Sequence, residues 1–157
     1  MIIDPLRDLP GYLLRRVSVD LMAKLAARLA TLDLRPAEAT VLMVIGANPG
    51  VTQSEIGRLL DIATANMTPL AARLAARELI VRERVDGRSH GLKLSEAGRR
   101  LTHRARAIMD SFESAEILGR VPASQRAAFV SALRALASAP GAMATDARKP
   151  RRAPRTA

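Results

Sequence analysis

Apolar residues recur at steps of three and four along most of this chain, the spacing of helices that bury one face. Such a stripe begins near Gly11 and predicts a first helix over residues 11–32. Pro36 and Glu38 then open a second helix, since proline suits the first helical position and an acid suits the first turn. This helix is apolar nearly all round, so we expect it to be buried, and NPG at 48–50 ends it.

Two shorter helices follow. Thr52 and Glu55 form a capping-box pattern at the start of the first. Three of its residues are expected to face inward: Ile56, Leu59 and Leu60. The second is expected over residues 64–78, with its start between Thr64 and Asn66 because Pro69 is tolerated only near a helix start. Its predicted buried stripe is Met67, Leu70, Ala71 and Leu74.

A hairpin and two further helices complete the pattern. Residues 81–94 alternate with period two on both sides of a DG step at 86–87, which favours a tight turn. Ser95 caps a long helix over 96–118, and a last helix is expected over 123–139. The apolar stripe of the long helix is predicted to contain Leu101, Ala105, Ile108, Phe112, Ala115 and Leu118. This order predicts a mainly α fold with a small β-hairpin: a winged helix-turn-helix flanked by N- and C-terminal helices.

The 157 residues carry a formal net charge of +10, and 22 of the 25 basic residues are arginine. This charge favours an anionic partner: DNA, RNA or an acidic membrane surface. A GC-rich genome also produces an alanine- and arginine-rich chain, so the placement of the arginines is more informative than their number.

Several classes of protein are excluded by what the sequence lacks. It has no cysteine, and therefore no disulfides and no thiol-based zinc site. Because it has only two histidines, we also expect no histidine-rich metal site. A phosphate-binding glycine loop and a nucleophile with a histidine partner are both missing, so we expect no enzyme and no cofactor. Without a signal-peptide pattern or a long apolar run, the chain is expected to be cytoplasmic, with no membrane partner.

The helix over 64–78 is the candidate for reading bases. In helix-turn-helix proteins the second helix lies in the major groove, with its N-terminal residues at base edges. Opposite its buried stripe lie small residues together with Asn66 and Thr68, which can hydrogen-bond to bases. Arg73 and Arg77 can reach guanine or phosphate, and a solvated helix face is the alternative.

Three stretches, TQSEIGRLL, NMTPLAARLAARELIVR and DGRSHGLKLSEAG, follow one another between residues 34 and 101. As a set they resemble the MarR family of bacterial transcription regulators, and the flanking helices extend the resemblance to about residue 139. The sequence departs from the family in two places. The interval from Arg82 to Asp86 is shorter than usual, and Glu78 stands where a glycine is usual.

The resemblance implies a wing in which Arg88, held by Asp86, enters the minor groove. Thr52 and Gln53 begin a helix whose N-terminus attracts phosphate, although a plain helix cap explains them equally. The predicted DNA-binding residues are Thr52, Gln53, Thr64, Asn66, Thr68, Arg73, Arg77, Asp86, Arg88, Ser89 and His90.

The resemblance also implies a homodimer that reads a palindrome, with helices 11–32 and 96–139 interleaving between two copies. Their apolar stripes exceed what a small core covers, while packing within one chain is the alternative. Residues 1–139 are then one domain with a DNA-binding lobe over 34–98, and residues 140–157 form a basic disordered tail.

Many similar regulators bind small aromatic or phenolic acids between the dimer helices and the DNA-binding lobe. Tyr12, Arg16 and His103 are the candidates to line such a cleft, with ordinary packing as the alternative. The predicted function is a dimeric, sequence-specific, DNA-binding transcriptional regulator associated with the nucleoid, a ligand-responsive repressor of a palindromic operator. The alternative is a non-specific architectural or RNA-binding winged helix, and the ratio of specific to random-DNA affinity separates the two.

Overall fold

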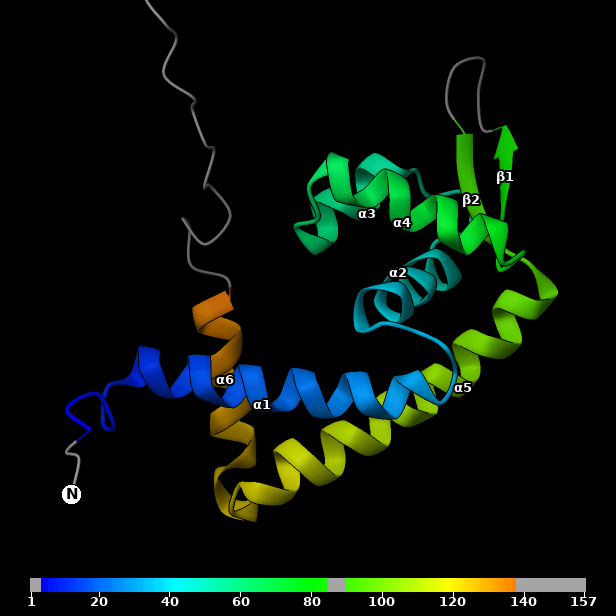
Figure 1. Cartoon of the computed structure of the whole chain (residues 1–157). Coiled ribbons are helices and arrows are strands. Elements are labelled where there is room, and N and C mark those ends of the chain that lie inside the picture. The colour runs from blue at the N-terminus through cyan, green and yellow to red at the C-terminus, as the bar shows by residue number, and fades with distance from the viewer. Residues whose placement is uncertain (1–3, 85–89, 138–157) are drawn as a thin grey trace, which may run out of the picture. The chain divides into compact units, whose positions relative to one another are not determined.

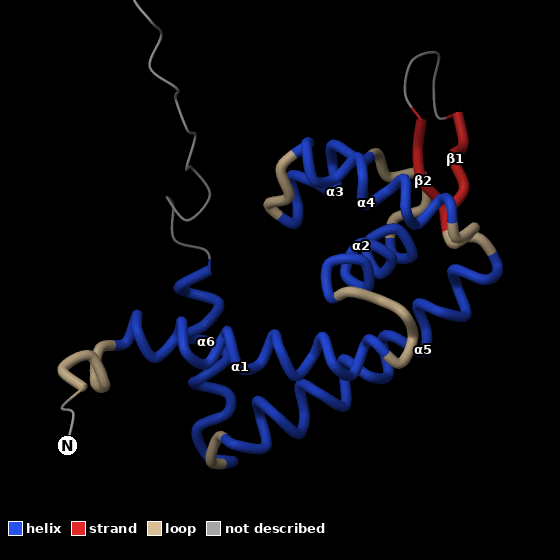
Figure 2. Tube along the Cα trace, viewed as in Figure 1, coloured by secondary structure: helices blue, strands red, loops and turns tan. Residues whose placement is uncertain are grey.

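The structure of the protein, a computed structural model, describes residues 4–84 and 90–137. The chain divides into two compact units after Arg120, and the relation between them is not defined. In the described residues the first unit contains five α-helices and a two-stranded hairpin, and the second contains one α-helix (Figures 1 and 2). The elements are α1 (Pro10–Ala30), α2 (Pro36–Ala47), α3 (Gln53–Leu60), α4 (Thr64–Ala76), β1 (Ile80–Arg84), β2 (His90–Leu94), α5 (Glu96–Phe112) and α6 (Arg126–Ala137). The predicted fold class is confirmed.

The core of the first unit is built around α2, which lies between the α3–α4 pair and the α1–α5 pair (Figure 1). As predicted, Pro36 begins the helix and its apolar residues are buried. Glu38 closes a capping box, because its carboxylate accepts a hydrogen bond from the backbone N–H of Arg35 at 2.9 Å. The buried residues of α2 are Glu38, Ala39, Val41, Leu42 and Ile45.

Helices α3 and α4 form the helix-turn-helix. Thr52 caps α3 as predicted, and Asp61 ends it with a left-handed φ of 52°. The predicted inward position of Leu59 is wrong, since its side chain is 64% exposed. The core side of this short helix runs through buried Ile56 and half-buried Leu60 instead.

Helix α4 starts at Thr64, inside the predicted window, and its predicted stripe of Met67, Leu70, Ala71 and Leu74 is buried. It ends two residues earlier than predicted because Glu78 adopts a left-handed φ of 55°. The backbone N–H groups of Glu78 and Leu79 donate to the carbonyls of Ala75 and Leu74, at 2.9 and 3.0 Å. This is the Schellman pattern, in which the left-handed residue is usually glycine.

Replacing Glu78 with glycine is expected to raise the free energy of unfolding by about 1 kcal/mol, because glycine adopts the left-handed conformation without a Cβ clash. Thermal denaturation followed by circular dichroism measures this gain. Glu78→Ala keeps a Cβ and should give none of it. An equal rise in both variants would assign the gain to loss of the carboxylate rather than to the backbone.

Strands β1 and β2 pair antiparallel, with Ile80 opposite Leu94 at the base of the hairpin. Ile80 and Leu92 are buried, so the inward face is the one that they share. Val81, apolar in the alternating pattern, is 49% exposed because it lies on the other face. The DG turn predicted at 86–87 lies outside the described residues.

Helix α5 begins after Ser95, whose hydroxyl accepts a hydrogen bond from the backbone N–H of Gly98 at 2.9 Å, as the predicted cap requires. The α-helical turns end at Phe112, and Glu113–Ile117 form a π-helical turn. This wider turn changes which side chains face inward. Ala115 is therefore exposed, contrary to the predicted stripe.

Glu116, in the π-helical turn, joins the end of this long helix to α1. Its carboxylate accepts hydrogen bonds from Arg28 and Arg120, both at 2.8 Å, and lies 3.8 Å from the Lys24 ammonium. The Arg28 guanidinium also stands 5.2 Å from the centre of the Phe112 ring. These contacts determine where α1 packs against the C-terminal end of α5.

The second unit contains α6, which begins at Arg126 after a 3₁₀ turn over Ala123–Gln125. No residue of α6 is buried. None of the helices in the described part of the chain has the length and apolar character needed to span a membrane.

Candidate functional site

The outward face of α4 carries polar side chains close to the helix N-terminus. Thr64, Asn66 and Thr68, three of the predicted DNA-binding residues, are all exposed there. Ala65 and Pro69 lie between them and are also exposed. Because these neighbours are small, the hydroxyl and amide groups can approach the edges of base pairs closely.

A groove of about 610 Å³ lies between α3 and the start of α4. It brings together three of the predicted residues, Gln53, Thr64 and Thr68. Arg58 of α3 lines the same groove and is exposed, although sequence reasoning did not single it out. Its place four residues after Ser54, which lines the same groove, was the available signal, because residues four apart share a helix face.

Thr52 is engaged in the cap of α3. Its hydroxyl donates to a Glu55 carboxylate oxygen at 2.7 Å and accepts from the Glu55 backbone N–H at 3.3 Å. The pKa of Glu55 lies below its usual value, first because the Thr52 backbone N–H donates to the carboxylate and then because the hydroxyl does. A phosphate contact by Thr52 stays a prediction beside this cap.

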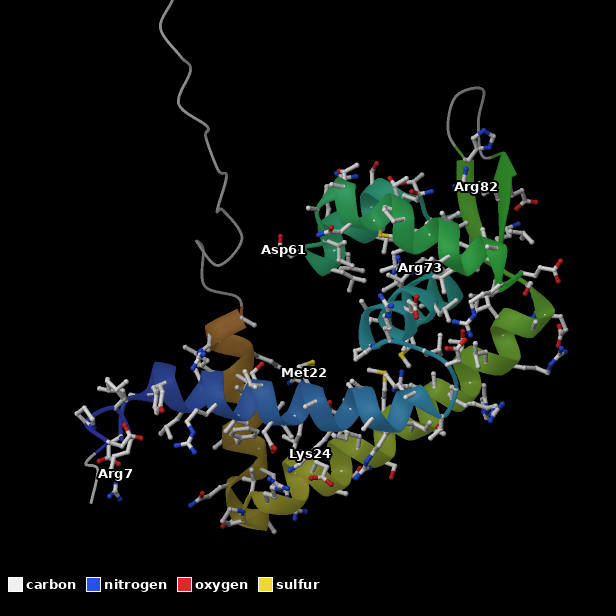
Figure 3. The ribbon with its side chains drawn as sticks, in the orientation of Figure 1. Arg7, Met22, Lys24, Asp61, Arg73 and Arg82 are labelled. Atoms are coloured by element: carbon white, nitrogen blue, oxygen red, sulfur yellow. The ribbon has the colours of Figure 1, made fainter. Side chains whose placement is uncertain are left out.

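The hairpin stands next to α4 and places an arginine and a histidine beside it. His90 is exposed at the start of β2, and Arg82 is exposed on β1 (Figure 3). The other predicted wing contacts, Asp86, Arg88 and Ser89, lie outside the described residues.

Arg73 and Arg77, the other predicted DNA contacts on α4, each pair with an acid. The Arg73 Nε lies 3.2 Å from Glu38 Oε1. Arg77 donates to the backbone carbonyl of Asp33 at 2.7 Å, and its other terminal nitrogen lies 3.3 Å from Asp33 Oδ2. Contacts of these arginines with DNA stay predictions, and their acidic partners were not predicted from the sequence.

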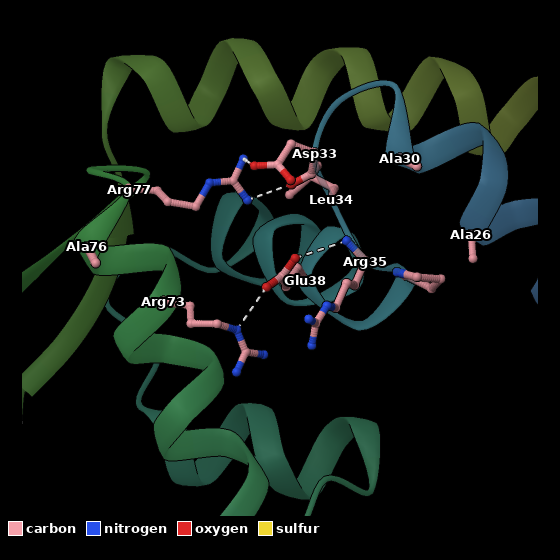
Figure 4. A pocket seen from close by; sticks show the side chains of 10 residues that line it. Ala26, Ala30, Asp33, Leu34, Arg35, Glu38, Arg73, Ala76 and Arg77 are labelled. Carbon is pink, nitrogen blue, oxygen red and sulfur yellow. Dashed lines mark hydrogen bonds and ion pairs between the residues drawn. The ribbon is translucent and has the colours of Figure 1, made fainter.

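The two ion pairs border a cleft of about 510 Å³ between α1, α2 and α4 (Figure 4). Small side chains, Ala26 and Ala30, form its α1 side, and Arg35 joins the two arginines of α4 in its lining. An apolar wall beside several guanidinium groups suits a small organic anion.

The comparisons with known proteins decide the family. The MarR family model matches residues 32–89. The transcriptional repressor CouR, bound to a 23-mer DNA duplex, is similar with a TM-score of 0.79 and 31% identity, over 87% of this chain and 98% of CouR. The chain belongs to the MarR family. The predicted family and the predicted function class, a DNA-binding transcriptional regulator, are thereby confirmed.

Two further MarR-type structures hold small molecules. CouR bound to p-coumaroyl-CoA has a TM-score of 0.78 and 30% identity, over 88% of this chain and 98% of CouR. The Mycobacterium tuberculosis MarR family protein Rv2887, in complex with salicylic acid, has a TM-score of 0.67 and 30% identity, over 83% and 98%. No curated protein matches the sequence.

In this MarR-family chain the three predicted ligand contacts lie away from the cleft of Figure 4, whose lining contains none of them. The Arg16 guanidinium stands 5.7 Å from the centre of the Tyr12 ring, within α1, and His103 is exposed on α5. The cleft is therefore built from other residues. Across residues 4–84 and 90–137, acidic and histidine side chains do not gather into a metal site.

Proposed function

We propose that this MarR-family protein is a repressor that reads a short palindrome, with one α4 of a dimer in each of two successive major grooves. The exposed face of α4 carries the proposal, because Thr64, Asn66 and Thr68 stand there among small residues. The DNA complex of CouR supports it. We place the protein in the cytoplasm, at the nucleoid, where a regulator meets its operator.

The dimer is proposed from the stretch of α1 between Leu13 and Met22. Five large apolar side chains there are between 43% and 62% exposed: Leu13, Leu14, Val17, Val19 and Met22. An apolar surface of this extent marks an interface. A second copy of this chain is the partner that covers this surface in our proposal. A palindrome requires such a dimer, since two-fold symmetry sets two recognition helices about one DNA turn apart. We assign α1, α5 and α6 to this interface and residues 34–98 to the DNA-binding lobe.

Replacing Val17 with glutamate is expected to convert the protein to a monomer, because a carboxylate would be buried without a partner at the interface. Sedimentation velocity measures the change in mass. Leu59→Glu is the matched control: it places the same charge at an exposed leucine outside α1 and should leave the dimer intact. If the Val17→Glu protein stayed dimeric, the assignment of α1 to the interface would be wrong.

We propose that the effector is a small aromatic or phenolic acid bound in the cleft between α1, α2 and α4. The lining carries three guanidinium groups, two of which pair with Glu38 and Asp33, so three positive and two negative side chains leave one net positive charge that favours a carboxylate. The alanines leave room for a ring. The ligands of CouR and Rv2887, p-coumaroyl-CoA and salicylic acid, support an aromatic group.

Salicylate is expected to weaken binding of the protein to its operator by about 5- to 150-fold, the usual range of coupling between two sites. Fluorescence anisotropy of a labelled operator duplex, titrated with and without salicylate, measures the shift. Benzyl alcohol has the ring without the carboxylate and should leave the affinity unchanged. Equal effects of the two compounds, or no effect of either, would contradict recognition of the carboxylate.

A further inference from the structure

The recognition helix α4 is tied to the start of α2 and to the turn before it by two arginines that lie one turn apart. Arg73 contacts Glu38 near the start of α2, and Arg77 contacts Asp33 in the turn after α1. Both arginines thus reach across the cleft rather than along the outward face of α4 (Figure 4).

Glu38 is the stronger of the two anchors. It is 4% exposed, and each of its carboxylate oxygens has a defined donor: the backbone N–H of Arg35 for one and the Arg73 Nε for the other. A buried carboxylate that loses its cation is costly, so Glu38 holds Arg73 firmly. Asp33 has a 93% exposed side chain, and its ion pair with Arg77 is screened by water.

Since Glu38 also closes the N-terminal cap of α2, it links the buried central helix directly to α4. The hydrogen bond from the Arg35 backbone N–H holds the Glu38 carboxylate in place, and the carboxylate in turn holds the Arg73 side chain. The position of α4 relative to α2 therefore depends on a group that does not itself face DNA.

We propose that Glu38 is a positioning residue for the recognition helix, and that an organic anion in the cleft acts by drawing Arg73 away from it. This inference rests on the proposed function. Figure 4 shows the guanidinium groups of Arg35 and Arg73 turned toward the same part of the cleft. An anion seated between them competes with Glu38 for Arg73.

The test is Glu38→Gln, which keeps the size of the side chain and an oxygen for the Arg35 N–H while removing the charge. We expect its affinity for the operator to fall about tenfold, the value of one hydrogen bond to a charged group. The affinity of this variant for random DNA should not fall, since the lost charge is negative. Salicylate should shift its operator affinity less than it shifts that of the wild type. Asp110→Asn removes an exposed acid of α5 and controls for net charge.

Arg73→Gln and the double variant complete the cycle. If Glu38 acts through Arg73, the double variant binds the operator no more weakly than either single variant. Wild-type affinity of Glu38→Gln, or additive losses, would overturn the inference. Should Glu38→Gln fail to fold, Arg73→Gln alone tests the tie, because it removes the same ion pair from its more exposed partner. A response to salicylate equal to that of the wild type would then overturn it. A wild-type protein that reads no palindrome would instead contradict the proposed function.

Discussion

Replacing Gly98 with alanine is expected to lower the free energy of unfolding by about 3 kcal/mol, at the upper end of the usual cost of overpacking. A Cβ at this position would lie 1.9 Å from the backbone carbonyl oxygen of Leu79. That oxygen already accepts a hydrogen bond from the Ser95 backbone N–H at 3.0 Å, so it cannot move without loosening the start of α5. Urea denaturation followed by circular dichroism measures the loss.

Gly11→Ala is the matched control for this substitution. Gly11 also lies in a helix, but a Cβ there would meet no atom within 4 Å. We expect this variant to be as stable as the wild type or slightly more stable, because alanine favours helix. A Gly98→Ala protein that unfolds at the same urea concentration as Gly11→Ala would show that the contact with Leu79 relaxes without cost.

Replacing Thr68 with glutamate is expected to weaken operator binding at least about 100-fold, because it would set a carboxylate against the phosphates and base edges that we propose α4 to contact. Thr68 is exposed, so the stability of the fold should change by no more than about 0.5 kcal/mol. Fluorescence anisotropy with labelled operator measures the affinity, and a melting curve checks the fold.

Ala97→Glu controls for the added charge. Ala97 is exposed in the first turn of α5, where an acid is compatible with the helix dipole. Its operator affinity should stay within about threefold of the wild type, the size of a screened charge effect. If both variants lost affinity equally, net charge rather than the α4 face would account for DNA binding.

Features that depend on a few neighbouring residues were predictable from the sequence. The Thr52–Glu55 capping box, the start of α2 at Pro36 and the Ser95 cap all appear as predicted. Each is decided by hydrogen bonds that span three or four residues, and the sequence contains both partners.

Features that depend on residues far apart in the chain were not predictable from the sequence. Ala115 is exposed because of the π-helical turn, and Leu59 is exposed because it lies away from the core side of α3. In the sequence both residues follow ordinary helical spacing, so the pattern alone does not reveal their exposure. Glu38 and Arg73 are 35 residues apart, so only the fold brings them together at the cleft. For the same reason the lining of the cleft differs from the three ligand contacts that were predicted.

The central claim, that a dimer reads a palindrome through α4, is tested most directly by selecting DNA from a random pool. The purified full-length protein is used at physiological salt with competitor DNA, because non-specific binding is strongly salt-dependent. The account predicts enrichment of an inverted repeat whose half-sites are about one helical turn apart. Tight binding without an enriched motif would contradict it and would indicate an architectural or RNA-binding winged helix.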